Sequence, residues 1–154
     1  MKASFFAVLA MVVLPTDLAA QERTSIGHSY EDGAALVYGV PDSRDMTLSF
    51  DCATNSDTLA FVYAFEPQNA SDGMKVEVLL RSGDVAVPVA TVGSRLEMDD
   101  IFVLEGELKF DSRTAGIITS AGFLQISVGE QSEGIPLAGS RAAATSLLDA
   151  CIQS

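Results

Sequence analysis

The stretch Met46–Cys52 (MTLSFDC) decides the fold of this chain. Leu48, Phe50 and Cys52 alternate with polar residues, which is the two-residue period of a strand with one buried face. This strand ends on one of only two cysteines. The other, Cys151, closes the last apolar helical stripe of the chain. We therefore expect one strand and one terminal helix to be joined there.

The first 20 residues have the pattern of a secretory signal peptide. Lys2 gives a positive start, residues 3–14 are small or apolar, and Leu18-Ala19-Ala20 offers a cleavage site before Gln21. The apolar run is shorter than the roughly 20 residues that a membrane-spanning helix needs. A buried N-terminal helix or a retained anchor is the alternative. We expect an exported chain, periplasmic or secreted, with no membrane span after cleavage.

Two cysteines in an exported chain indicate a disulfide. A bridge between Cys52 and Cys151 closes a loop of about 100 residues, for which the chain-entropy model gives on the order of 4–5 kcal/mol of stability. The alternatives are two buried free thiols or one reactive thiol. His28 is the only histidine and lies far from both cysteines in sequence. The residues therefore favour neither a Cys-His pair nor a zinc site.

The net negative charge of the chain makes some classes of binding partner unfavourable. The formal net charge is −12, and the proposed signal removes one charge of each sign, so this value persists after cleavage. A strongly acidic surface repels nucleic acids and anionic lipid headgroups. We therefore expect neither a nucleic-acid partner nor peripheral membrane binding.

The rest of the chain has the length of one domain. Residues 21–33 are polar, and we expect a flexible or edge-lying N-terminal segment there. We expect residues 34–154 to form a single β-rich domain. Short stretches rich in apolar and β-branched residues, separated by turn residues, predict strands at 34–40, 46–52, 58–65, 75–81, 85–92, 101–110, 123–128 and 135–138.

The clearest hairpin joins residues 75–81 and 85–92 around Ser82-Gly83-Asp84. Pro88 removes a backbone donor, so its strand is expected at an edge or with a bulge. Residues 93–100 are polar and predict a crossover connection.

Two helices are expected. Asp111-Ser112 can cap a short helix near residues 112–121 that stops at Gly122, with a strand as the alternative. Ser140 can cap the terminal helix, whose apolar stripe follows a 3.6-residue period at Ala144, Leu147, Leu148 and Cys151. The sum predicts an antiparallel β-sandwich or small barrel with a C-terminal α-helix packed on it.

No catalytic constellation is found in the sequence. His28 lies in the polar N-terminal segment, and no Gly-x-Ser-x-Gly elbow is present. The densest carboxylates are Glu97, Asp99, Asp100, Glu105 and Glu107. A solvated strand face is the main interpretation of this cluster. A weak calcium site or a glycosidase pair is the alternative.

The segment from Tyr38-Gly39-Val40-Pro41-Asp42-Ser43 to Leu48-Ser49-Phe50-Asp51-Cys52 resembles small exported proteins of Gram-negative bacteria. In these, a Gly-hydrophobic-Pro turn leads to a strand that ends in Cys. The tail, Ile135-Pro136-Leu137-Ala138-Gly139 and then a helix closing on Leu148-Asp149-Ala150-Cys151, is similar to their ends. The resemblance implies a periplasmic β-rich domain with a strand-to-helix disulfide and no assigned reaction.

The sequence thus favours a non-enzymatic binding or accessory protein without a cofactor. Its expected partner is an envelope protein, engaged through exposed strand edges and loops. The alternatives are a small hydrolase or cation-binding protein that uses residues 97–107, or a purely structural envelope component.

Overall fold

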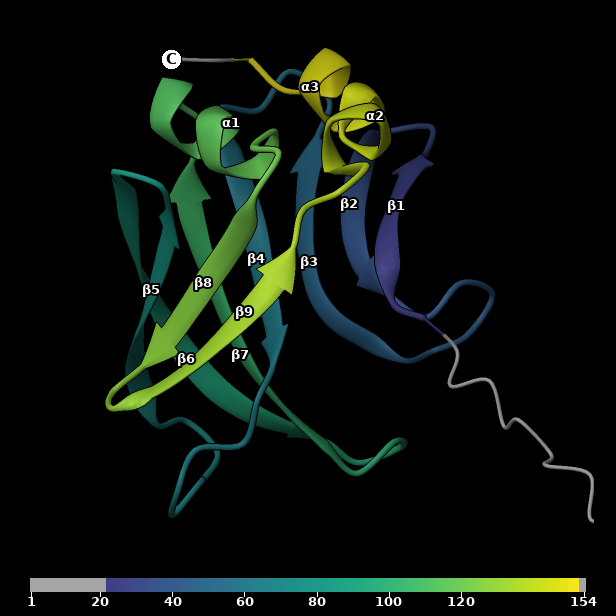
Figure 1. The fold of residues 1–154 in the computed structure, drawn as a ribbon. Helices are drawn as coiled ribbons and strands as arrows, with labels where there is room; N and C mark the ends of the chain where they lie inside the picture. The colour runs from purple at the N-terminus through teal and green to yellow at the C-terminus, as the bar shows by residue number, and fades with distance from the viewer. Residues whose placement is uncertain (1–21, 153–154) are drawn as a thin grey trace, which may run out of the picture.

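A computed structural model describes residues 22–152 as one nine-stranded antiparallel sheet with three short helices (Figure 1). The signal-peptide prediction for residues 1–20 lies outside the described residues. The strands are β1 (Thr24–Ser29), β2 (Gly33–Gly39), β3 (Met46–Ala53), β4 (Thr58–Ala64), β5 (Lys75–Ser82), β6 (Val85–Leu96), β7 (Ile101–Lys109), β8 (Phe123–Val128) and β9 (Gln131–Pro136). The helices are α1 (Ser112–Ile118), α2 (Ser140–Ala143) and α3 (Thr145–Ala150).

The sheet curls into an open half-barrel. Its strand order is β1-β2-β3-β4-β7-β6-β5-β8-β9, so β1 and β9 form its two edges. In Figure 1, β8 and β9 cross in front of the strands at the back of the sheet. The hydroxyl of Tyr63 on β4 reaches the carboxylate of Glu133 on β9, 2.7 Å away, across the inside of the curl. The predicted fold class, mainly antiparallel β with a C-terminal helix, is confirmed. The sheet has the shape of an open barrel.

The strand β3 forms as its alternation predicts. Leu48, Phe50 and Cys52 are buried on the inner face of the sheet. The ring of Phe50 lies 5.6 Å from that of Phe61, its cross-strand partner on β4. These side chains belong to one continuous apolar core that includes residues from β2 to β9. Burial of a large apolar side chain contributes about 1.5–3 kcal/mol, so this face fixes the register of the strand.

The three helices lie together at one end of the half-barrel (Figure 1). Asp111 caps α1 and accepts hydrogen bonds from the backbone N–H groups of Arg113 and Thr114, both at 2.9 Å. These bonds also hold the pKa of the Asp111 carboxyl below its usual range. The helix predicted near residues 112–121 is therefore present, although it ends at Ile118. Within residues 22–152, no helix has the length and hydropathy of a membrane span.

The terminal helix differs from its prediction. A break at Ala144 divides it into α2 and α3, and the N-cap is Gly139 instead of Ser140. Gly139 has a φ of 80°, a conformation that suits a residue without a side chain. Ser140 is buried, and its hydroxyl donates to the carbonyl of Ser120. The apolar stripe survives the break, because Ala144, Leu147 and Cys151 are all buried.

The edge-lying alternative for the N-terminal segment is the one that the structure shows: residues 24–29 form the edge strand β1, whose whole length is paired with β2. One strand prediction needs correction. Residues 93–96, expected in a crossover, instead extend β6 to Leu96 and pair with β7. Their polar side chains misled the prediction, because a strand with a solvated face needs few apolar residues.

Pro88 does not mark an edge strand, since β6 lies between β5 and β7. The two ladders of β6 are offset, however. Pro88 pairs with Leu79 of β5, whereas the ladder with β7 reaches only as far as Thr91. The proline therefore occupies a part of β6 that is paired on one side, where the missing donor breaks no ladder.

Candidate functional site

The five carboxylates of the acidic segment 97–107 lie in two separate places in the structure. Glu97, Asp99 and Asp100 lie at the turn between β6 and β7, whereas Glu105 and Glu107 lie on the exposed face of β7. At about 3.3 Å per strand residue, Glu107 is roughly 23 Å from Asp100. All five side chains are exposed. In the part of the chain that the structure describes, no group of three or more His, Cys, Asp or Glu residues is placed to hold a metal ion.

Basic side chains neutralise part of this turn. The guanidinium of Arg95 donates to the carboxylate of Asp100 at 3.1 Å and to that of Glu66. It also lies 5.6 Å from the ring centre of Phe102. Asp99 forms a weaker pair with Arg44 at 3.9 Å. The turn is thus a local ion-pair network on the surface, worth little in stability because it is solvated.

A shallow hollow of about 740 Å³ opens on the outer face of the sheet, beside the start of β2. The turn between β1 and β2 forms one wall and the turn between β3 and β4 forms the other. Asp51, Ala60 and Glu107 are neighbours in adjacent strands and lie on its floor. Glu31 and Asp32 add carboxylates at the rim. The side chain of Ala60 is smaller than those of its neighbours Asp51 and Glu107, which leaves the hollow between them.

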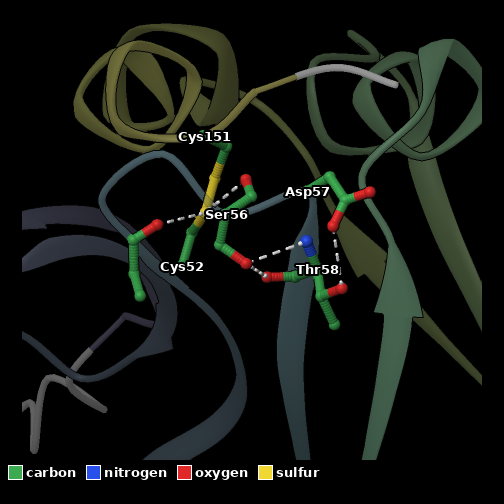
Figure 2. The surroundings of a disulfide bond; sticks show 6 residues. Cys52, Ser56, Asp57, Thr58 and Cys151 are labelled. Atoms are coloured by element: carbon green, nitrogen blue, oxygen red, sulfur yellow. Dashed lines mark hydrogen bonds between the residues drawn. A yellow bond between two sulfur atoms is a disulfide. The ribbon is translucent and has the colours of Figure 1, made fainter.

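The disulfide holds one wall of this hollow (Figure 2). Cys52 at the end of β3 is bonded to Cys151 after α3, with a Cα–Cα distance of 6.0 Å. The disulfide that the sequence predicts is therefore present. Two backbone hydrogen bonds reinforce it: Asn55 N–H to the carbonyl of Ala150 at 2.8 Å, and Ile152 N–H to that of Ser56 at 2.9 Å.

The two walls are also joined to each other. The N–H of Thr54, in the turn after β3, donates to the carbonyl of Asp32 at 2.8 Å. Ser56 closes its own turn, because its hydroxyl accepts from the N–H of Thr58 at 3.1 Å, as Figure 2 shows. The C-terminal residues, the turn after β3 and the turn after β1 therefore form one connected corner of the molecule.

The edge strand β1 runs from this corner and presents free backbone groups. Tyr30 N–H donates to the carbonyl of Gly33 at 2.8 Å, which closes the hairpin between β1 and β2. Hydrogen-bonded pairs alternate along an antiparallel ladder, so Ser25, Gly27 and Ser29 direct their backbone N–H and C=O groups away from β2. Within residues 22–152, no strand pairs with that outer edge.

The side chains of β1 do little to block this edge. Its six residues (TSIGHS) include no charge and no proline, the usual devices that keep an edge from pairing. On the inner face, α2 lies directly against the strand. A Cβ atom on Gly27 would be 2.1 Å from the carbonyl oxygen of Ala143, so the close approach requires glycine at this position.

His28 lies on the outer face of β1 and is exposed. Its ring is stacked with that of Tyr30, with ring centres 6.3 Å apart and planes 9° from parallel. Tyr30 is 58% exposed and lines the rim of the hollow. The histidine is therefore part of a flat aromatic surface beside the free edge. Both cysteines are held in the disulfide, so neither is a nucleophile for it to activate.

The opposite edge, β9, is better protected. Pro136 lies at its end and lacks a donor, and Glu133 points its charge inward, where its carboxylate accepts the hydrogen bond from Tyr63. The pKa of the Tyr63 hydroxyl is raised well above its usual range, mainly by burial and to a smaller extent by this hydrogen bond to Glu133. An inward charge and a proline are both recognised obstacles to edge pairing. The candidate binding site is therefore the outer edge of β1 together with the hollow.

Sequence reasoning missed β1 because its residues are mostly small and polar. The alternation of Ser25, Gly27 and Ser29 with Ile26 and His28 is the one signal that could have revealed it. Comparison with family models, with curated proteins and with solved structures finds no match to this chain.

Proposed function

We propose that this chain is an exported, non-enzymatic binding protein that takes an extended segment of an envelope partner on the outer edge of β1. The observation that carries the proposal is the uncharged edge, with outward backbone groups at Ser25, Gly27 and Ser29. An added strand gains affinity from main-chain hydrogen bonds and specificity from alternate side chains. Each hydrogen bond contributes about 0.5–1.5 kcal/mol net, so three to six of them support a useful affinity.

Two features support an exported location. The first 20 residues follow the pattern of a cleaved secretory signal. The bond between Cys52 and Cys151 fits an oxidising compartment, in which structural disulfides persist. Together with the resemblance to exported proteins of Gram-negative bacteria, they favour the periplasm.

The hollow at the end of β1 supports a particular partner chemistry. A strand paired with β1 continues past Ser29 toward the rim formed by Tyr30, Glu31 and Asp32. Aromatic and acidic groups there suit a Lys or Arg side chain of the added strand. The net charge of −12 favours approach of a basic segment in the same way.

The test is capture of envelope proteins on the immobilised chain, compared between two matched variants. Ser29→Pro removes an outward donor from β1, and Ser132→Pro does the same at the corresponding outward position of β9. We expect at least one protein to be retained by the wild type and by Ser132→Pro but lost with Ser29→Pro. Equal retention by both variants, or no retention by the wild type, would contradict the proposal.

A further inference from the structure

A pocket of about 130 Å³ opens inside the curl, between the end of β4 and the hairpin of β8 and β9. Its apolar side consists of Ile126 and Val128 together with Tyr63 and Phe65, whose stacked rings have centres 5.4 Å apart. Among the residues that line it, Glu133 is the one carboxylate. The three helices lie toward the other end of the half-barrel (Figure 1). The mouth of a barrel is a common place for a small-ligand site.

The carboxylate of Glu133 is held in position but is not neutralised. One of its oxygens accepts the hydrogen bond from the hydroxyl of Tyr63, 2.7 Å away. A carboxylate has about four sites that accept hydrogen bonds, so most of its capacity remains for a ligand. Within residues 22–152, no Lys or Arg side chain forms an ion pair with Glu133. The pocket therefore presents a fixed negative charge beside apolar and aromatic walls.

These walls select one class of ligand. An anion is repelled by Glu133 and by the net charge of −12. A metal ion such as calcium needs several oxygen ligands, and one carboxylate supplies too few. An ammonium group on a hydrocarbon stem suits both parts of the pocket, because its N–H groups form charge-assisted hydrogen bonds and its stem covers the apolar wall. A cation beside an aromatic ring gains further attraction. A cavity of about 150 Å³ admits benzene, so a stem of about four carbons fits here.

We infer that this pocket binds an organic ammonium group with an apolar stem, carried by a free amine or by the side chain of a lysine. Glu133 binds the ammonium group, Tyr63 positions the carboxylate, and Phe65 forms part of the wall along the stem. The inward charge that protects the β9 edge thus has a second use. The pocket is separate from the β1 edge, and its occupation does not depend on the function proposed for that edge.

The first experiment follows the backbone amides of the oxidised protein by NMR during titration with n-butylammonium chloride, which corresponds to a lysine side chain without its backbone. We expect saturable shifts at Phe65, Ser132 and Glu133, with a dissociation constant on the order of millimolar, since so small a ligand makes few contacts. n-Butanol has the same stem without the charge and should bind at least about fivefold more weakly. Equal binding of the amine and the alcohol, or shifts that do not saturate, would overturn the inference.

Two variants with the same change in net charge separate the pocket from the overall field of the protein. Glu133→Gln keeps the shape of the side chain and removes its charge, and it should weaken n-butylammonium binding at least about fivefold. Glu130→Gln alters an exposed residue of the turn before β9 that does not line the pocket, and it should leave binding unchanged. Equal losses in the two variants would show attraction by net charge alone and would overturn the inference.

The source of the ammonium group is distinguished with Nα-acetyl-lysine methylamide, which carries the backbone of a lysine within a chain. Saturable shifts at the same residues with this compound would support a lysine side chain of a partner protein. Saturation with n-butylammonium alone would support a free amine as the ligand. Saturation with neither compound would overturn the inference and leave the proposal for β1 standing, because Ser29 does not line this pocket.

Discussion

The two edges of the sheet share one backbone pattern and differ in how they are defended. The outward positions of β1 are Ser25, Gly27 and Ser29, and those of β9 are Ser132, Gly134 and Pro136. In β9, the residue between the first two is a glutamate whose charge is held inside the curl by Tyr63. In β1, the corresponding residue is an isoleucine, and no charge or proline appears.

The supports behind the two edges differ as well. The edge strand β1 rests on α2, and the neighbouring strands are fastened to α3 by the disulfide and two backbone hydrogen bonds. The strand β9 is paired along its length with β8 and has apolar contacts and the hydrogen bond from Tyr63 across the curl, but none of the three helices in residues 22–152 has comparable contacts with it. The edge strand that is supported by helices and by the disulfide is thus the one whose outer edge carries no charge or proline. A rigid, accessible edge costs less entropy to bind than a mobile one.

The largest expected effect comes from removing the disulfide that supports the β1 side. Cys151→Ser should lower the free energy of unfolding by on the order of 4 kcal/mol, because the bond spans 99 residues. Denaturant unfolding measures this change. Reduction of the wild-type protein is the matched control and should give the same loss.

The same variant tests whether the two edges have separate supports. Hydrogen exchange should accelerate in β1 and β2 more than in β8 and β9, since α3 contacts β1, β2 and β3. Equal acceleration along both edges would show that the disulfide stabilises the molecule as a whole, and the comparison would lose its basis.

The second effect compares two glycines at corresponding positions. Gly27→Ala places a methyl group 2.1 Å from the carbonyl oxygen of Ala143 and should cost about 1–3 kcal/mol as the helix is displaced. At Gly134 of β9, the nearest atom is a side-chain carbon of Phe123 at 3.9 Å. Gly134→Ala should therefore change stability by less than about 0.5 kcal/mol. Similar losses for both would contradict the close packing of α2 on β1 alone.

The third effect concerns the hydrogen bond that holds β9. Tyr63→Phe should cost about 1 kcal/mol at neutral pH, because a buried hydroxyl bonded to a carboxylate is lost. Denaturant unfolding at neutral pH measures the loss. Glu133→Gln keeps an acceptor at the same place and should cost less.

This bond also gives the stability a dependence on pH. The folded protein raises the pKa of Tyr63 above the usual value of 10.0, so the neutral hydroxyl is the favoured form. Its contribution is fully present below pH 10.0 and is lost as the pH rises toward the folded-state pKa. The difference between wild type and Tyr63→Phe should therefore shrink above pH 10.0. A difference that stays constant at alkaline pH would show that packing, not the hydrogen bond, holds β9.

The smallest effect is expected from calcium. The carboxylates near β1 surround an open hollow, and within residues 22–152 no three of them converge as metal ligands. Calcium and chelator should therefore shift the unfolding midpoint by less than about 1 °C. A ligand present at 100 times its dissociation constant would add about 2.7 kcal/mol, so a true site would be obvious. A large shift would assign the acidic hollow a different role.

The sequence predicts the inner face of the fold well. Leu48, Phe50 and Cys52 alternate clearly, and the stripe that ends at Cys151 places the second cysteine on the buried side of its helix. Both signals come from the burial of apolar side chains, because the spacing of apolar residues is the strongest indication of secondary structure in a sequence. Cys52 and Cys151 are the only cysteines in the chain, and each lies on a buried face that the sequence predicts. These two facts are enough to predict the disulfide.

The candidate site is harder to predict, for physical reasons. The edge strand β1 is stabilised by backbone pairing with β2 and by contact with α2, and neither requires apolar side chains. The acidic cluster looks dense in sequence, yet an extended strand separates Asp100 from Glu107. The hollow assembles Glu31, Asp51 and Glu107 from three distant segments. Such a site depends on topology, which local pattern does not encode.

The corner that joins Asp32, Thr54 and Ala150 has a consequence for the order of assembly. A chain made from its N-terminus exposes Cys52 long before Cys151 exists; at about 5–20 residues per second, synthesis of the intervening chain takes roughly 5–20 s. During this interval, β1 to β3 can pair but lack the helices that cover them. The strand that begins the sheet is therefore among the last parts of the molecule to reach its finished surroundings.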